Sequence, residues 1–119
     1  MKDFRKLMVW EKAHGIAVDT YAITLNFPKE ETYGLTSQMR RAASSVPTNI
    51  AEGCGRGSNA DFARFIQIAL GSSSELEYLF ILATDLKYLG TELANEIELR
   101  IQEIKKMLTG LIKKLKTDG

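Results

Sequence analysis

The sequence contains few of the residues that build catalytic sites, metal sites or covalent cross-links. Its single cysteine, Cys54, excludes an intrachain disulfide and indicates a reducing compartment. Its N-terminus lacks the uninterrupted apolar region of a secretory signal, so we expect a cytoplasmic protein. A net charge of +1 excludes a strongly basic nucleic-acid binder, although it allows a local basic patch.

The single histidine, His14, is the only candidate for imidazole chemistry. Di-metal sites in helix bundles use a pair of E-x-x-H motifs; Glu11 and His14 have this spacing, but the chain has no second histidine that could complete the pair. We therefore expect no metal and no cofactor, and a packing or hydrogen-bonding role for this side chain. A general base or metal ligand is the alternative.

Alternating strand patterns are also missing, and the only prolines are Pro28 and Pro47. Apolar residues instead recur at three- and four-residue steps, which predicts helices. We expect an N-terminal arm over residues 1–6 and four helices over residues 7–26, 32–52, 58–89 and 91–116, with Leu35 as the alternative start of the second helix. Long helices with short connections predict an all-α fold, a single-domain antiparallel up-down-up-down four-helix bundle.

Pro47 lies inside the second predicted helix, where it removes one backbone hydrogen bond. We expect a kink at Pro47, with a break near Ser45 as the alternative. The glycine-rich run over residues 53–57 is expected to form a turn that requires positive φ angles; an anion held by Arg56 is the alternative. Ser58 and Asp61 have capping-box spacing, which predicts the start of the third helix.

The third predicted helix is apolar enough between residues 65 and 82 to raise a membrane span. Gln67, three serines and two glutamates interrupt this run, so we expect no membrane association. Gly71 costs about 1 kcal/mol relative to alanine inside a helix. Close approach of the second helix or of another subunit is the expected reason for it.

The charges suggest two further features. In the fourth helix carboxylates come early and lysines late, which gives either a solvated basic end or a local nucleic-acid patch. Arginine–carboxylate pairs between helices two and three are expected among six residues, with exposed helix faces as the alternative; the six are Arg40, Arg41, Glu52, Arg64, Glu75 and Glu77.

The number of large apolar side chains exceeds what one small bundle is expected to enclose. Exposed apolar patches of this kind usually become interfaces, so we predict self-association. The candidate interface residues are Phe4, Trp10, Phe62 and Phe65.

Three motifs occur together in the first three predicted helices. They are R-R-A-A at residues 40–43, P-x-N-I-A-E-G at residues 47–53 and G-S-x-x-E-L-E at residues 71–77. With matching positions from about residue 3 to residue 89, the chain resembles the bacterial four-helix-bundle proteins encoded in intervening sequences of 23S ribosomal RNA genes. It is also similar to the accessory proteins of diversity-generating retroelements.

This resemblance implies a ring-shaped homopentamer without known enzymatic activity. For the retroelement relatives it implies binding of nucleic acid and of a reverse transcriptase. Candidate nucleic-acid contacts are Arg40, Arg41, Arg56 and Arg64, together with Lys113, Lys114 and Lys116 at the end of the fourth helix. The leading hypothesis is a homo-oligomeric adaptor that engages RNA, DNA or a nucleic-acid enzyme. The alternatives are a scaffold that binds only proteins and an enzyme or metal-binding bundle.

Overall fold

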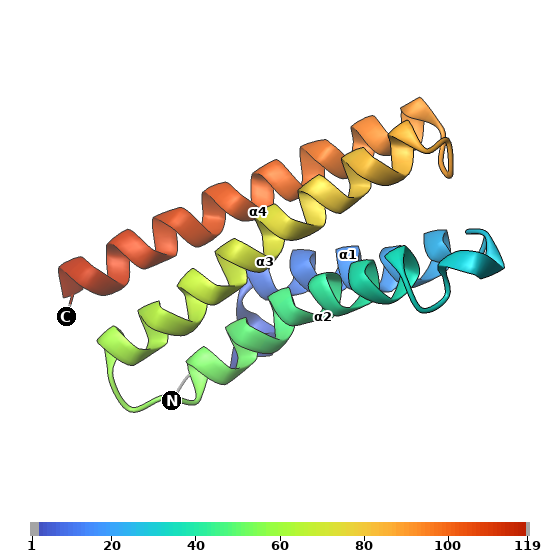
Figure 1. Ribbon diagram of the computed structural model, residues 1–119. Helices are drawn as coiled ribbons and strands as arrows, with labels where there is room; N and C mark the ends of the chain where they lie inside the picture. Colours follow the sequence, from blue (N-terminus) through green and yellow to red (C-terminus); the bar gives the residue numbers. More distant parts are fainter. Residues whose placement is uncertain (1–2, 119) are drawn as a thin grey trace.

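The computed structural model describes residues 3–118, which form four α-helices and two short 3-10 helices (Figure 1). The α-helices are α1 (Met8–Thr24), α2 (Leu35–Cys54), α3 (Asn59–Asp85) and α4 (Thr91–Asp118). The 3-10 helices are η1 (Phe4–Lys6) and η2 (Lys29–Glu31). Each α-helix packs against the next one along the chain, and α1 also contacts α4, whereas the diagonal pairs have no Cα atoms within 8 Å of each other among residues 3–118. The predicted all-α antiparallel bundle is therefore confirmed.

The apolar stripes of all four helices meet in one core. Burial of each large apolar side chain contributes roughly 1.5–3 kcal/mol, so these stripes supply most of the stabilisation. The largest apolar side chains that are almost fully buried are Met39, Ile50, Ile66, Leu76, Ile97, Ile101 and Leu108.

Several helix ends differ by one to four residues from those expected. α1 ends at Thr24, and the next residues continue in a tighter turn before Pro28. α2 starts at Leu35, the later of its two expected starts: residues 29–31 form η2, and Glu31 Oε1 accepts a hydrogen bond from the Leu35 backbone N–H at 3.1 Å. α3 ends at Asp85 because the backbone turns at Lys87, which has a φ of 68°. Left-handed backbone terminates a helix, and lysine gives no sequence signal for it.

Pro47 lies within α2, and the helix is continuous through Ser45, so the alternative of a break there is wrong. The kink at Pro47 stays a prediction. The glycine-rich run does form the α2–α3 turn, but no glycine among residues 3–118 has a positive φ, so that explanation is wrong. Gly53 is required for space instead: an added Cβ would lie 2.8 Å from Cδ1 of Phe62.

Ser58 caps α3 as expected, because its hydroxyl accepts a hydrogen bond from the Asp61 backbone N–H at 3.1 Å. The small residues of α3 meet α2 where the Ser45 and Ser72 hydroxyls lie 2.9 Å apart. Gly71 itself faces open space, so no other backbone among residues 3–118 requires a glycine there. None of the described helices is long and apolar enough to cross a bilayer, as the interrupting polar residues of α3 predicted.

Candidate interaction surfaces

An open apolar groove runs between α1 and α2 on the outside of the bundle. We call it the α1–α2 groove; it has a volume of about 520 Å³ and is lined by Phe4, Trp10, His14, Ala17, Val18, Tyr21, Ser44, Pro47, Thr48 and Ala51. Asp3 caps η1 through the Arg5 backbone N–H, which fixes the short helix that carries Phe4. The rings of Phe4 and Trp10 meet edge to face at 5.0 Å. Two of the four expected interface residues therefore line an accessible apolar surface.

His14 continues this aromatic row. Its ring stacks on that of Trp10, with centroids 4.9 Å apart and an interplanar angle of 5°. No group of three or more potential metal ligands occurs in the part of the chain that the structure describes. The described neighbours of His14 therefore give it a packing role in the wall of the groove.

Phe62 and Phe65 are buried within the bundle, which corrects the expectation that they remain exposed. They are 5% and 7% exposed, so they offer almost no surface to a second copy. Phe62 fills the space beside Gly53 in the core. Phe65 is covered by two guanidinium groups, those of Arg56 at 4.4 Å and Arg64 at 4.6 Å from its ring centroid.

The candidate nucleic-acid contacts Arg56 and Arg64 are thus brought together at the α2–α3 turn. Arg64 Nε donates to Oδ1 of Asp61 at 2.9 Å, and Arg56 Nε lies 3.8 Å from Oδ2 of the same carboxylate. Arg56 Nη2 also lies 3.7 Å from Oε2 of Glu52. Carboxylates and a buried ring already engage both cations, so a phosphate would have to compete with these contacts.

Arg40 and Arg41 lie elsewhere, nearer the opposite end of the bundle. Arg40 Nε donates to the Thr24 hydroxyl at 2.9 Å, and its Nη2 donates to the Tyr21 carbonyl at 3.2 Å. Its guanidinium also lies 4.7 Å from the centroid of the Tyr21 ring, so Arg40 ties α2 to the end of α1. Arg41 is exposed and makes no ion pair with residues 3–118.

Lys113, Lys114 and Lys116 are exposed in the last turns of α4, and within residues 3–118 no carboxylate pairs with them. The antiparallel order places this end of α4 at the same end of the bundle as the α2–α3 turn (Figure 1). Five of the seven candidate nucleic-acid contacts therefore lie at the end of the bundle that holds the α2–α3 turn. The other two, Arg40 and Arg41, lie nearer the opposite end.

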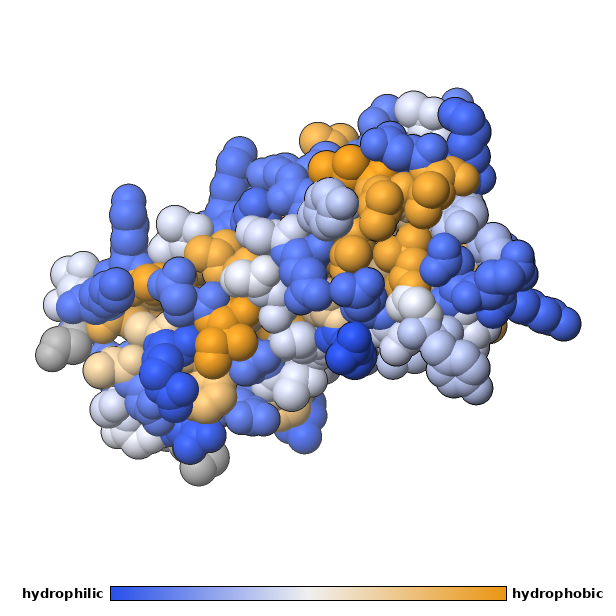
Figure 2. All heavy atoms as spheres, viewed as in Figure 1, coloured by the Kyte–Doolittle hydropathy of each residue, from blue (hydrophilic) through white to orange (hydrophobic). Residues whose placement is uncertain are grey.

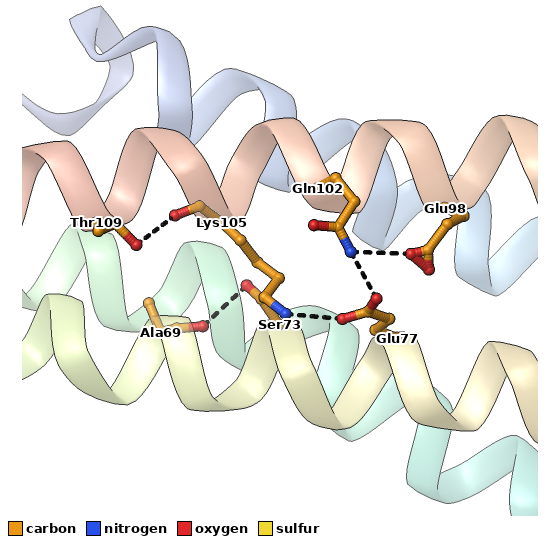
Figure 3. A network of polar contacts seen from close by, with 7 residues as sticks. All are labelled: Ala69, Ser73, Glu77, Glu98, Gln102, Lys105 and Thr109. Carbon is orange, nitrogen blue, oxygen red and sulfur yellow. Dashed lines mark hydrogen bonds and ion pairs between the residues drawn. The ribbon is translucent and has the colours of Figure 1, made fainter.

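A polar network that the sequence did not reveal connects α3 to α4 (Figure 3). Lys105 Nζ donates to Oε1 of Glu77 at 2.8 Å, and Gln102 Nε2 donates to Oε2 of Glu77 at 2.6 Å and to Oε2 of Glu98 at 3.0 Å. Glu77 was expected to pair with an arginine of α2, and it pairs with Lys105 of α4 instead. No arginine–carboxylate pair among the six residues named for helices two and three forms within residues 3–118, which corrects that expectation.

The two carboxylates of this network have opposite pKa shifts. The hydrogen bond from Lys105 lowers the pKa of Glu77 below its ordinary value. Burial, together with the neighbouring Glu77 carboxylate, raises the pKa of Glu98. The spacing of Glu98, Gln102 and Lys105 at i, i+4 and i+7 is the signal that places these three polar groups on one flank of the apolar stripe of α4.

Beside this network a second groove opens between the C-terminal half of α3 and the N-terminal half of α4. This α3–α4 groove has a volume of about 390 Å³ and is lined by Glu77, Phe80, Ile81, Thr84, Asp85, Ala94, Asn95, Glu98 and Ile101. Figure 2 shows an apolar patch over this end of α3 and α4, bordered by hydrophilic residues. An apolar floor with a carboxylate rim suits a ligand that is itself apolar on one side and cationic on the other.

Together these features define an antiparallel four-helix bundle with surface grooves on two helix pairs. Residues 5–110 match the family described as 23S rRNA-intervening sequence protein. The chain belongs to this family, which confirms the family predicted from its motifs. The similarity to accessory proteins of retroelements stays a prediction.

A solved structure supports this assignment. The chain is similar to a protein with unknown function from the S23 ribosomal protein family of Bacteroides thetaiotaomicron VPI-5482, with a TM-score of 0.80 and 29% sequence identity. The alignment covers 89% of this chain and 99% of that one. No curated protein sequence matches the chain.

Proposed function

We propose that this chain is a non-enzymatic adaptor that assembles with copies of itself through the α1–α2 groove. The observation that carries the proposal is this accessible apolar groove, in which Phe4 and Trp10 line the surface with few polar groups around them. Apolar surface of this kind costs free energy in water and is usually covered by a partner. No catalytic step is part of the proposed function.

Two observations favour a second copy as the occupant. The apolar surface extends beyond the groove at the end of α1, because Leu25 follows Tyr21 by four residues on the same helix face and is 76% exposed. The family resemblance also implies a ring-shaped homopentamer. A ring needs a heterologous interface, in which two different surfaces of each copy meet, and the α1–α2 groove supplies one of the two surfaces.

The test is the mass of the protein in solution, measured by light scattering during size-exclusion chromatography at micromolar concentrations. Val18 is 53% exposed in the wall of the groove, so Val18→Glu places a charge on the interface without entering the core. Leu99→Glu is the matched control, because Leu99 is exposed on α4 outside both grooves.

We expect an oligomer for the wild type and for Leu99→Glu, and a monomer for Val18→Glu. Trp10, the only tryptophan, adds a second readout, since its emission shifts to shorter wavelength when the groove is covered. A monomeric wild type, or an unchanged mass for Val18→Glu, would refute the proposed interface.

A second proposed function is nucleic-acid binding at the basic end of the bundle. It is supported by Lys113, Lys114 and Lys116, which project from α4 without carboxylate partners within residues 3–118. With a net charge of only +1, affinity must come from this local cluster and from its multiplication in an oligomer. The resemblance implies contact with a nucleic-acid enzyme such as a reverse transcriptase, and this partner stays a prediction.

The second function is tested with a labelled RNA hairpin in fluorescence anisotropy at increasing salt. The triple variant Lys113→Ser, Lys114→Ser, Lys116→Ser should bind more weakly. The slope of the logarithm of its binding constant against the logarithm of the salt concentration should also be shallower, by about 0.7–0.9 for each phosphate that the variant no longer neutralises. Lys29→Ser is the control, because Lys29 is an exposed cation in η2 at the opposite end. Absence of wild-type binding at low salt would favour the scaffold that binds only proteins.

A further inference from the structure

The α3–α4 groove combines an apolar floor with an excess of negative charge. Its floor includes Phe80, Ile81 and Ile101, and the carboxylates of Glu77, Asp85 and Glu98 border it. Glu77 alone pairs with a cation, Lys105. Among residues 3–118 the neutral amide of Gln102 is the only side chain that donates a hydrogen bond to Glu98, and Asp85 makes no ion pair there. Three carboxylates therefore share one cation.

We propose that this groove binds an amphipathic helix rich in lysine or arginine that belongs to another protein. The apolar face of such a helix would cover Ile81 and Phe80, and its cations would approach Asp85 and Glu98. The complementary charges would orient the partner and speed its association, while the apolar floor supplies the contact area.

A second copy of this chain does not fit the groove equally well. Its most lysine-rich segment is the last part of α4, and the apolar residues of that segment, Leu108, Ile112 and Leu115, are already buried in the core. That helix therefore presents lysines outwards without an apolar face beside them. Nucleic acid is disfavoured at this groove because phosphates would face the three carboxylates.

The pKa shift of Glu98 also supports a basic helix as the occupant of the groove. Burial and the nearby Glu77 carboxylate raise the pKa of Glu98, so its charged form is less favourable than that of an exposed glutamate. A bound lysine or arginine would lower this pKa and release a proton. Binding is therefore expected to strengthen as the pH rises through the titration of Glu98, with Glu77, Lys105 and Asp85 as the other charged groups at the groove.

The experiment uses a labelled synthetic helix of leucine and lysine, with the leucines on one face, titrated with the whole protein in fluorescence anisotropy. Two comparison peptides replace all lysines by glutamate or all leucines by serine, and both should bind at least about tenfold more weakly. In the protein, Glu98→Gln with Asp85→Asn removes two rim charges with little change of shape. Glu75→Gln is the control, because Glu75 is an exposed carboxylate of α3 outside the groove.

We expect the affinity of the double variant to fall about tenfold and that of the control to stay within about twofold of wild type. Ile81→Ser should weaken binding of the leucine–lysine helix as well, since it removes part of the apolar floor. Equal affinity for wild type and double variant, or equal binding of the glutamate peptide, would overturn the proposal. The self-association variant Val18→Glu should bind the peptide normally, so failure of the proposed oligomer and failure of this docking site give different results.

Discussion

Two helical glycines provide a matched test of how closely α2 and α3 pack. Gly53 in α2 and Gly71 in α3 both lie inside helices, and alanine is favoured over glycine there by up to about 1 kcal/mol. At Gly71 an added Cβ meets nothing within 4 Å. At Gly53 it would lie 2.8 Å from Cδ1 of Phe62 and 3.1 Å from Cβ of Phe65.

The expected change in the free energy of unfolding differs between the two sites, because an added Cβ has open space at Gly71 and crowded space at Gly53. Gly71→Ala should raise the free energy of unfolding by about 1 kcal/mol, because only the helix preference changes. Gly53→Ala has at most the same gain, but crowding of a packed core costs roughly 1–3 kcal/mol, because Phe62 is 5% exposed and has little room to move. The difference between the two variants should therefore be about 1–3 kcal/mol in favour of Gly71→Ala.

Urea unfolding followed by circular dichroism, at one fixed protein concentration, measures this difference. If Gly53→Ala proves as stable as Gly71→Ala, the close contact between Gly53 and Phe62 is not a constraint on the fold. Phe62→Leu provides the matching rescue, since a smaller side chain beside Gly53 should reduce the cost of the added methyl group. A coupling energy near zero between the two changes would contradict the contact directly.

Two further variants test individual interactions. Lys105→Met should lower the free energy of unfolding by roughly 1.5–3 kcal/mol at neutral pH, because it removes a charged hydrogen bond to Glu77. Since Lys105 lowers the folded-state pKa of Glu77 from the ordinary value of 4.5, this contribution is present above that value and disappears as the pH falls through the folded pKa. Urea unfolding between pH 3 and pH 7 should show that the difference in the free energy of unfolding between Lys105→Met and wild type shrinks in acid. Lys106→Met is the control, because Lys106 is an exposed neighbour without an ion pair within residues 3–118, and it should change stability little at either pH. Lys87→Gly should raise the melting temperature, because left-handed backbone costs a residue with a Cβ about 1 kcal/mol, and an unchanged or lower value would show that the φ of 68° carries no strain.

The helices were predictable because their apolar residues repeat at the helical period. The stripe of α4 shows this clearly, with Ile97, Ile101, Ile104 and Leu108 all buried as expected. The start of α3 was also predictable, since Ser58 and Asp61 have capping-box spacing. The end of α3 was not, because a lysine adopts the left-handed conformation that glycine usually provides.

The surface was only partly predictable, because periodicity shows which face of a helix is apolar but not what covers its edges. Phe4 and Trp10 were expected at an accessible apolar surface and line the α1–α2 groove. Phe65 has the same sequence character, yet two guanidinium groups cover it, and these contacts depend on the geometry of the α2–α3 turn. The pairing of Glu77 with Lys105 depends likewise on the register between α3 and α4, which one sequence does not contain.

The order of the helices assigns the two grooves to separate sides of the bundle. The backbones of α1 and α3, and those of α2 and α4, lie diagonally across the core with no Cα atoms within 8 Å among residues 3–118, so the α1–α2 pair and the α3–α4 pair form opposite faces. A copy seated on the α1–α2 groove would therefore leave the carboxylate-rimmed α3–α4 groove open on the far side. The free lysines of α4 project from one end of the bundle, apart from both grooves. The three proposed interactions, namely self-association, binding of a basic helix and contact with phosphates, therefore use three different surfaces. A bundle this small can bind several partners at once only if its surfaces are separated in this way.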